Sequence, residues 1–135
     1  MTSTLFGSCH CGAVRFSCDL DISAPTSRCN CSICSKTRLW KSDPLPSHAF
    51  RLLQGSSSLI EYRFANRRVA HMFCGRCGIK VFGHGGTDAF PAEFYVINIA
   101  ALDAISDELR ASLPVIYQDG RHDDWETAPT TTDCL

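Results

Sequence analysis

The chain has 135 residues, of which 44% are hydrophobic and 20% are charged, and its formal net charge is −1. This balance is typical of one folded globular domain, and it excludes a disordered tail, a coiled coil and a low-complexity linker. No run approaches the roughly 18 consecutive apolar residues that a membrane-spanning helix needs. We therefore expect residues 1–135 to form a single domain with no membrane partner. Because the first residues lack the basic and apolar segments of a signal peptide, we expect a cytoplasmic location.

Short strand-like segments follow one another along the chain. Residues 13–17 alternate apolar and polar side chains, which is the two-residue period of a half-buried strand. Similar strands are predicted at residues 50–53, 59–64, 69–73, 79–82 and 94–99. Residues 41–47 predict a loop, residues 26–38 show no clear period, and residues 100–113, followed by Pro114, form the one predicted helix. The sequence therefore predicts a mainly β fold with one short helix.

The charges are divided unevenly along the chain. Residues 1–87 carry a net charge of +7 and residues 88–135 carry −8, and eight of the nine cysteines lie in the basic part. These charges either solvate two faces of the protein, or the basic part offsets thiolate charge and attracts an anionic ligand.

Seven of the nine cysteines form three clusters with metal-binding spacing. The clusters are Cys9 and Cys11, then Cys29, Cys31 and Cys34, then Cys74 and Cys77. An odd number of cysteines excludes complete pairing within the chain, and reduced cysteines at short spacings are typical of metal binding or catalysis. Residues two apart on a strand point to one face, and a Cys-x-x-Cys turn wraps around an ion. Zinc is the predicted metal.

Seven thiols divide into four and three, which are the ligand numbers of a closed structural zinc and an open catalytic zinc. In one pairing, the first and third clusters close a site and the middle cluster forms the open one. In the other, Cys31 and Cys34 join the third cluster in a site similar to a zinc ribbon. Spacing alone leaves both pairings open.

Three motifs occur in a recognisable order: GSCHCGAVRF at residues 7–16, CNCSIC at residues 29–34 and FCGRCG at residues 73–78. With them, the chain resembles the glutathione-dependent formaldehyde-activating enzyme family, whose superfamily includes centromere protein V. The similarity extends through residues 50–55 and 62–64 to a tail with Trp125.

The resemblance implies which cysteines share a metal. It implies a structural zinc on Cys9, Cys11, Cys74 and Cys77, and a second, catalytic zinc on Cys29, Cys31 and Cys34. It also implies folded-over, twisted antiparallel β-sheets built around the structural zinc.

The resemblance further implies a zinc-dependent enzyme of the carbon–sulfur lyase type, similar to S-(hydroxymethyl)glutathione synthase. A thiol such as glutathione would bind at the open three-cysteine zinc and condense with a small aldehyde such as formaldehyde. A zinc with three thiolates suits thiol deprotonation better than carbonyl polarisation. Lys36 and Arg38 are expected either to contact the carboxylates of the thiol or to offset the negative charge of the site. Residues 35–40 (SKTRLW) depart from the family pattern, so the identity of the substrate stays open.

The alternative is a non-catalytic zinc-binding module that docks a protein or a nucleic acid. Nucleic-acid binding usually needs a domain with a pI above about 9. Here the pI is about 6.5, which disfavours that partner. A third hypothesis is a redox or metal-buffering protein that releases zinc on oxidation. The sequence leaves the oligomeric state open.

For five other residues we expect ordinary structural positions and no part in metal binding, with one exception for Trp40. Cys18 is expected to be a small residue of the core or the surface, Cys134 is expected to have no role, and His10 is expected to face away from the metal. Trp40 is expected either to pack in the core or to line the open site. Trp125 is expected to anchor the tail by packing.

Overall fold

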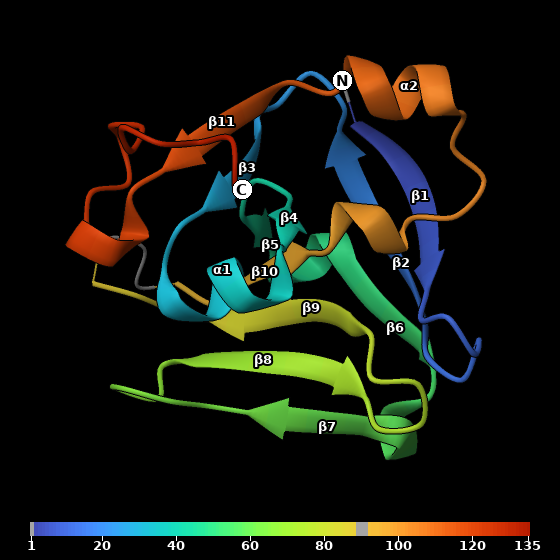
Figure 1. Cartoon of the computed structure of the whole chain (residues 1–135). Helices are drawn as coiled ribbons and strands as arrows, with labels where there is room; N and C mark the ends of the chain where they lie inside the picture. The colour runs from blue at the N-terminus through green and yellow to red at the C-terminus, as the bar shows by residue number, and fades with distance from the viewer. Residues whose placement is uncertain (1, 89–91) are drawn as a thin grey trace.

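A computed structural model describes residues 2–88 and 92–135, and strands in this part of the chain form three sheets (Figure 1). The first sheet has the order β1 (Thr2–Ser8), β2 (Arg15–Asp21), β6 (Phe50–Gln54). The second has the order β5 (Leu45–Pro46), β10 (Phe94–Ile97), β9 (Lys80–Gly85), β8 (Val69–Cys74), β7 (Leu59–Tyr62). The third has the order β11 (Val115–Gln118), β3 (Thr26–Cys29), β4 (Trp40–Lys41).

The helices of the described chain are short. They are α1 (Ser32–Thr37), α2 (Asp107–Ser112) and the 3-10 turns η1 (Ser47–Ala49), η2 (Ser56–Ser58), η3 (Ile99–Ala101) and η4 (Gly120–His122). None of the helices in residues 2–88 and 92–135 has the length and apolar character needed to cross a membrane.

The mainly β fold is confirmed, and the helices differ from the sequence prediction in two places. The segment 100–113 contains no continuous helix, because η3 ends at Ala101 and α2 begins only after Ser106. The Ser106 hydroxyl accepts a hydrogen bond of 3.0 Å from the Leu109 N–H and so caps α2. The helix α1 was not predicted. It lies in the segment 26–38, whose sequence shows no helical period.

The strands predicted from alternation are present, with shifted ends. The predicted segments correspond to β2, β6, β7, β8, β9 and β10. The sequence prediction missed β1, β3, β4 and β11, and the predicted loop at 41–47 contains β5. Pairing is antiparallel except between β11 and β3, which run parallel with Val115 opposite Thr26. The other strand pairs of the described chain are antiparallel, as the resemblance implies.

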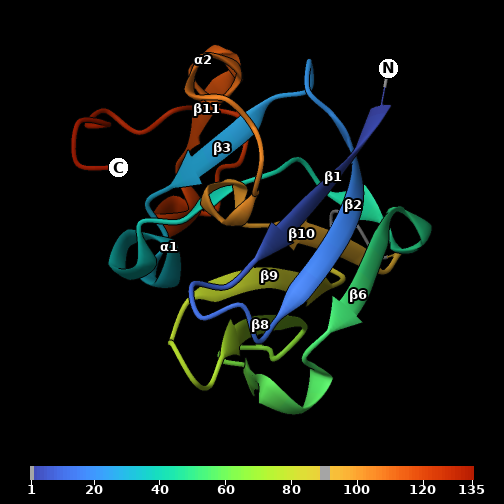
Figure 2. The ribbon, with the colours of Figure 1, turned by 90° about the vertical axis from the view of Figure 1, so that its right-hand side faces the viewer.

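The main core lies between the first two sheets. Figure 2 shows β1, β2 and β6 in front of β8, β9 and β10, with α1 and β3 farther to one side. Phe50 stacks on Tyr95 with ring centroids 4.5 Å apart, and Phe16 beneath them is fully buried. Cys18 lies in this core, which decides between the core and surface positions expected for it, and burial raises the pKa of its thiol to about 12. A separate small cluster contains Cys29, Cys34 and Leu39.

Candidate metal centres

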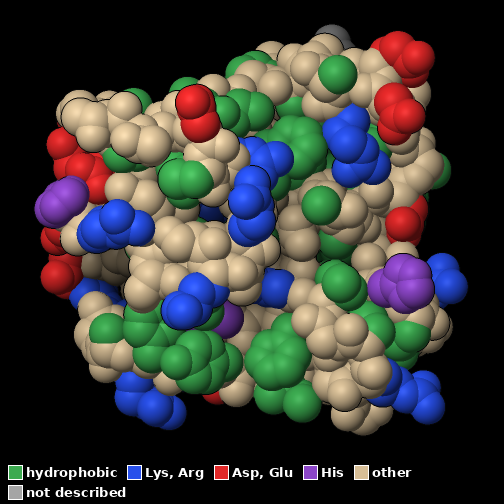
Figure 3. All heavy atoms as spheres, in the orientation of Figure 1, with side chains coloured by type: hydrophobic (Ala, Val, Ile, Leu, Met, Phe, Trp, Pro, Cys, Tyr) green, Lys and Arg blue, Asp and Glu red, His purple; other side chains and the backbone are tan. Residues whose placement is uncertain are grey.

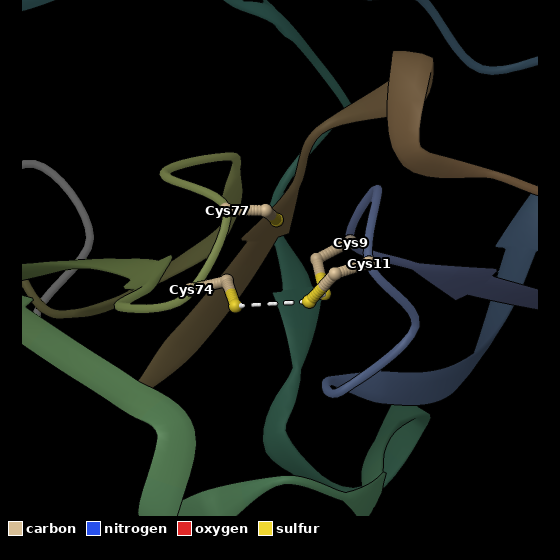
Figure 4. A group of neighbouring side chains, drawn as sticks. All are labelled: Cys9, Cys11, Cys74 and Cys77. Atoms are coloured by element: carbon tan, nitrogen blue, oxygen red, sulfur yellow. Dashed lines mark hydrogen bonds between the residues drawn. The ribbon is translucent and has the colours of Figure 1, made fainter.

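The first centre brings together cysteines from two turns (Figure 4). Cys9 and Cys11 come from the turn between β1 and β2, while Cys74 ends β8 and Cys77 lies in the turn to β9. The four Sγ atoms all lie within 4.8 Å of one another. Cys11 Sγ lies 3.6 Å from Cys9 Sγ and 3.7 Å from Cys74 Sγ. A tetrahedral zinc with bonds of about 2.3 Å places its sulfurs about 3.8 Å apart, so these residues fit that ion.

Backbone N–H groups support the sulfurs of this centre. The Val14 N–H donates to Cys9 Sγ and the Arg76 N–H donates to Cys74 Sγ, each at 3.3 Å. Such donors favour the thiolate form that a metal requires. Cys9 and Cys74 are buried and belong to the main core. Cys11 is exposed and Cys77 is partly buried, so the centre lies at the edge of the core with two of its four sulfurs inside it.

Backbone N–H groups also favour the thiolate form of Cys77. The backbone N–H groups of Cys11 and Ile79 donate to the sulfur and lower the pKa of the Cys77 thiol to about 6. The chain returns after this residue through Gly78, whose φ of 80° lies in the left-handed region that favours glycine. The glycine lets the turn close around the sulfurs.

The second centre has three cysteines. Cys29 ends β3, Cys31 precedes α1 and Cys34 lies in α1, and their Sγ atoms are within 4.8 Å of one another. In the described ranges no fourth Cys, His or carboxylate group joins them at that distance. Cys29 and Cys34 are buried, whereas Cys31 is partly exposed. The structure thus groups the seven thiols as four and three, in the first of the two pairings that spacing allowed.

Hydrogen bonds within the second centre concentrate negative charge on one sulfur. The thiols of Cys29 and then Cys34 donate to Cys31 and lower the pKa of the Cys31 thiol to about 2. The same bonds, with burial, raise the pKa of Cys34. The Cys31 N–H also donates to Cys29 Sγ at 3.4 Å. Three clustered sulfurs that stabilise a thiolate are a donor set suited to zinc.

The loop after β11 forms hydrogen bonds with the segment that carries the second centre. Asn30 lies between Cys29 and Cys31, and its side chain donates to Asp119 Oδ1 at 2.8 Å. The Arg121 N–H donates to Asn30 Oδ1 at 2.9 Å. Both ends of the Asn30 amide are therefore bonded to the segment 119–121, which fixes the backbone that carries the two cysteines.

Positive charge lies beside the second centre, but only partly where the sequence predicted it. A narrow crevice beside the second centre is lined by Arg38 together with Cys29 and Cys34. Lys36 is exposed on α1 and does not line this crevice. The sequence prediction missed Arg28, which lines it. It also missed Cys134, which the fold brings to the same crevice.

The two tryptophans lie in different surroundings, and of the two alternatives for Trp40 the structure favours packing in the core. Trp40 packs against the main core, and its Nε1–H donates to Thr26 Oγ1 at 2.7 Å. It does not line the crevice of the second centre. Trp125 is 44% exposed, and its Nε1–H donates to Asp123 at 3.1 Å within the tail. His10 is exposed and lies outside both cysteine groups.

Comparison with known proteins shows which family the chain belongs to. Residues 4–119 match the profile of the family described as "Glutathione-dependent formaldehyde-activating enzyme". A segment of 33 residues, 24% of the chain, is 61% identical to a Halomonas elongata protein named "Putative glutathione-dependent formaldehyde-activating enzyme". That segment spans only 21% of the relative's length. A crystal structure of a Rhodobacter sphaeroides protein is 29% identical, with a TM-score of 0.69, over 83% of this chain and all of that one.

Proposed function

Since the chain belongs to the glutathione-dependent formaldehyde-activating enzyme family, we propose that it joins a thiol, glutathione or a similar one, to a small aldehyde such as formaldehyde. This reaction is that of a carbon–sulfur lyase in the direction of synthesis. The observation that carries the proposal is the second centre, in which three thiols gather without a fourth ligand among the described residues. Catalytic zinc sites keep three protein ligands and one open position, whereas structural sites are closed by four.

Each cysteine group has its own role in this proposal. The first centre holds a structural zinc through Cys9, Cys11, Cys74 and Cys77. The second centre holds a zinc through Cys29, Cys31 and Cys34, and a zinc bound there would keep an added thiol deprotonated at neutral pH. Arg28 and Arg38 offer guanidinium groups to the carboxylates of the thiol. The partly exposed Cys31 marks the side from which a ligand reaches the centre.

The proposed reaction balances without an oxidant or reductant. The thiol loses its proton to solvent, and its sulfur attacks the aldehyde carbon. A carbon–sulfur bond forms, the carbon–oxygen π bond breaks, and the resulting alkoxide takes a proton from solvent. The product is a hemithioacetal, S-hydroxymethylglutathione when the reactants are glutathione and formaldehyde.

The test compares the protein with matched cysteine variants. Because the reaction also proceeds in solution, its rate at equilibrium is measured by NMR exchange spectroscopy with glutathione and formaldehyde. We expect faster exchange with the zinc-loaded protein, loss of the acceleration in Cys31→Ser, and full acceleration in Cys18→Ala, which alters a cysteine outside both centres. A zinc-loaded protein that leaves the exchange rate unchanged would overturn the proposal and favour a binding module.

A further inference from the structure

The fold brings one more cysteine to the second centre, from a segment far along the chain. Cys134 lines the crevice beside this centre, together with Cys29 and Cys34. The thiol of Cys134 is exposed, whereas Cys29 and Cys34 are buried. Figures 1 and 2 both place the segment that leads to residue 135 beside β3 and α1, the two elements that carry Cys29 and Cys34.

The segment 128–135 is attached to the rest of the protein by few polar contacts. In the described ranges its one hydrogen bond is local, from the Leu135 N–H to the Thr132 carbonyl at 3.0 Å. No ion pair joins the segment to another part of the described chain. The tail is anchored before it, at Trp125, whose ring centroid lies 5.4 Å from Lys41 Nζ. The segment can therefore shift while its anchor stays in place.

A shift of this segment would add Cys134 to the second centre. Its sulfur is not among the three that lie within 4.8 Å of one another, so ligation requires the segment to move toward Cys29 and Cys34. The movement breaks no hydrogen bond to another segment of the described chain. A thiol tethered beside the site has an effective concentration on the order of millimolar, which favours its binding over that of a dilute free ligand.

The chemistry of the crevice suits a fourth thiolate. A tetrahedral zinc is closed by four cysteine ligands, and the second centre has three. The crevice has no acidic side chain in its described lining, while Arg28 and Arg38 are part of it. Figure 3 shows Lys and Arg side chains spread over the face that carries α1, with acidic groups at its left edge and upper right. The surroundings of the crevice therefore offset an added negative charge.

We propose that Cys134 is a displaceable fourth ligand of the second centre, which occupies the open position until a thiol substrate takes its place. This inference rests on the zinc that the proposed function assigns to Cys29, Cys31 and Cys34. In the exchange, the bond from the metal to Cys134 Sγ breaks and a bond to the incoming sulfur forms. The proton of the incoming thiol passes to Cys134 Sγ, so the step needs no oxidant or reductant. The tail thereby sets the concentration at which the centre accepts a thiol.

The first test measures ligation at Cys134 itself. A metal-bound thiolate reacts slowly with iodoacetamide, and mass spectrometry follows the alkylation of each cysteine. We expect Cys134 to react about tenfold or more slowly in two-zinc wild type than in Cys31→Ser, in which the second zinc is lost. The control places the thiol elsewhere on the tail, in Thr131→Cys combined with Cys134→Ser, and that thiol should react equally fast with and without the second zinc. Equal rates at Cys134 in the two proteins would overturn the inference.

The second test counts the thiolates bound to the metal. In the cobalt-substituted protein, the thiolate-to-metal charge-transfer absorption increases with the number of bound thiolates. We expect Cys134→Ser to lose about an eighth of this absorption, because one thiolate of two four-cysteine sites is removed. Release of the second ion from Cys134→Ser, with the fold intact by circular dichroism, would support ligation as well. Asp133→Ala changes the neighbouring exposed residue and should keep the full absorption. An unchanged spectrum in Cys134→Ser would overturn the inference.

The third test concerns displacement. Binding of 2-mercaptoethanol is measured by calorimetry on the zinc-loaded proteins. We expect Cys134→Ser to bind this thiol about tenfold or more tightly than the wild type, because the tethered competitor is gone. Asp133→Ala should bind it as the wild type does. Equal affinity in Cys134→Ser and the wild type, or no binding to either protein, would overturn the displacement.

The outcome is distinguishable from a failure of the proposed function. Slow alkylation of Cys134 that depends on the second zinc, without accelerated exchange of glutathione and formaldehyde in the wild type or in Cys134→Ser, would leave the ligation standing and overturn the proposed reaction. Accelerated exchange in a protein whose Cys134 reacts equally fast with and without the second zinc would overturn the inference alone.

Discussion

Gly120 lies directly against the sulfur of Cys29. A Cβ atom at residue 120 would lie 2.5 Å from Cys29 Sγ and 2.8 Å from the ring of Trp125. Both distances are far shorter than non-bonded contacts allow, so only glycine fits here. The ligands of the second centre all lie in residues 1–87, the basic part of the chain. Gly120, in the acidic part, reaches them through the parallel pairing of β11 with β3.

Gly120→Ala is expected to damage the second centre selectively. The added methyl group must displace Cys29 Sγ or the Trp125 ring, and a displaced sulfur fits a tetrahedral ion poorly. Zinc measured by mass spectrometry should fall from two ions per chain toward one, while the fold persists by circular dichroism. Arg121→Ala is the control in the same turn, because it keeps the backbone N–H that binds Asn30 and should retain both ions. Two tightly held ions in Gly120→Ala would contradict this prediction.

The residues that the sequence could not predict are those placed by strand pairing. Cysteine spacing is a local pattern, so the three clusters can be recognised in the sequence. Spacing alone leaves two pairings of the clusters open. The fold decides between them, because it places the end of β8 beside the β1–β2 turn. Gly120 reaches the second centre only because β11 pairs in parallel with β3. No local pattern encodes these partners. The helix α1 has six residues, too few for a helical period to be recognised.

The two centres are expected to differ in their contribution to stability. Cys74 is fully buried in the main core, so Cys74→Ser should lower the free energy of unfolding by more than about 3 kcal/mol, the upper range of ordinary substitutions. Cys31→Ser should remove one zinc and leave the domain folded, because Cys31 lies at the exposed side of the second centre. Chemical denaturation and zinc analysis on the same samples measure both effects.

A matched control for these variants is Cys18→Ala, which alters a buried cysteine outside both centres. It should keep two zinc ions and lose only the small free energy of one sulfur's packing. Unfolding of Cys31→Ser together with a stable Cys74→Ser would show that the structural and catalytic assignments are reversed.

The buried imidazole of His71 predicts a loss of stability at mildly acidic pH. The folded protein binds a proton at His71 only near pH 4, whereas the unfolded chain binds it below about pH 6.5. Because the unfolded state takes the proton first, the His71 contribution to the free energy of unfolding decreases as the pH falls from about 6.5 to 4. NMR titration of the imidazole resonances measures the pKa directly. In Lys80→Met the pKa of His71 should rise, since the positive charge of Lys80, whose Nζ lies 2.7 Å from His71 Nδ1, has been removed; an unchanged value would contradict the contact.

Trp40 is expected to stabilise the fold without affecting the metals. Trp40→Phe removes the hydrogen bond to Thr26 Oγ1, an oxygen of a buried residue that also donates to the Pro114 carbonyl. The loss of one buried partner should cost about 1–3 kcal/mol in the free energy of unfolding. A double-mutant cycle with Thr26→Val isolates that bond, and we expect a coupling of about 1 kcal/mol. Zinc content should stay at two ions per chain, because Trp40 does not line the second centre. Loss of one zinc in Trp40→Phe with little change in stability would instead place this side chain at the metal.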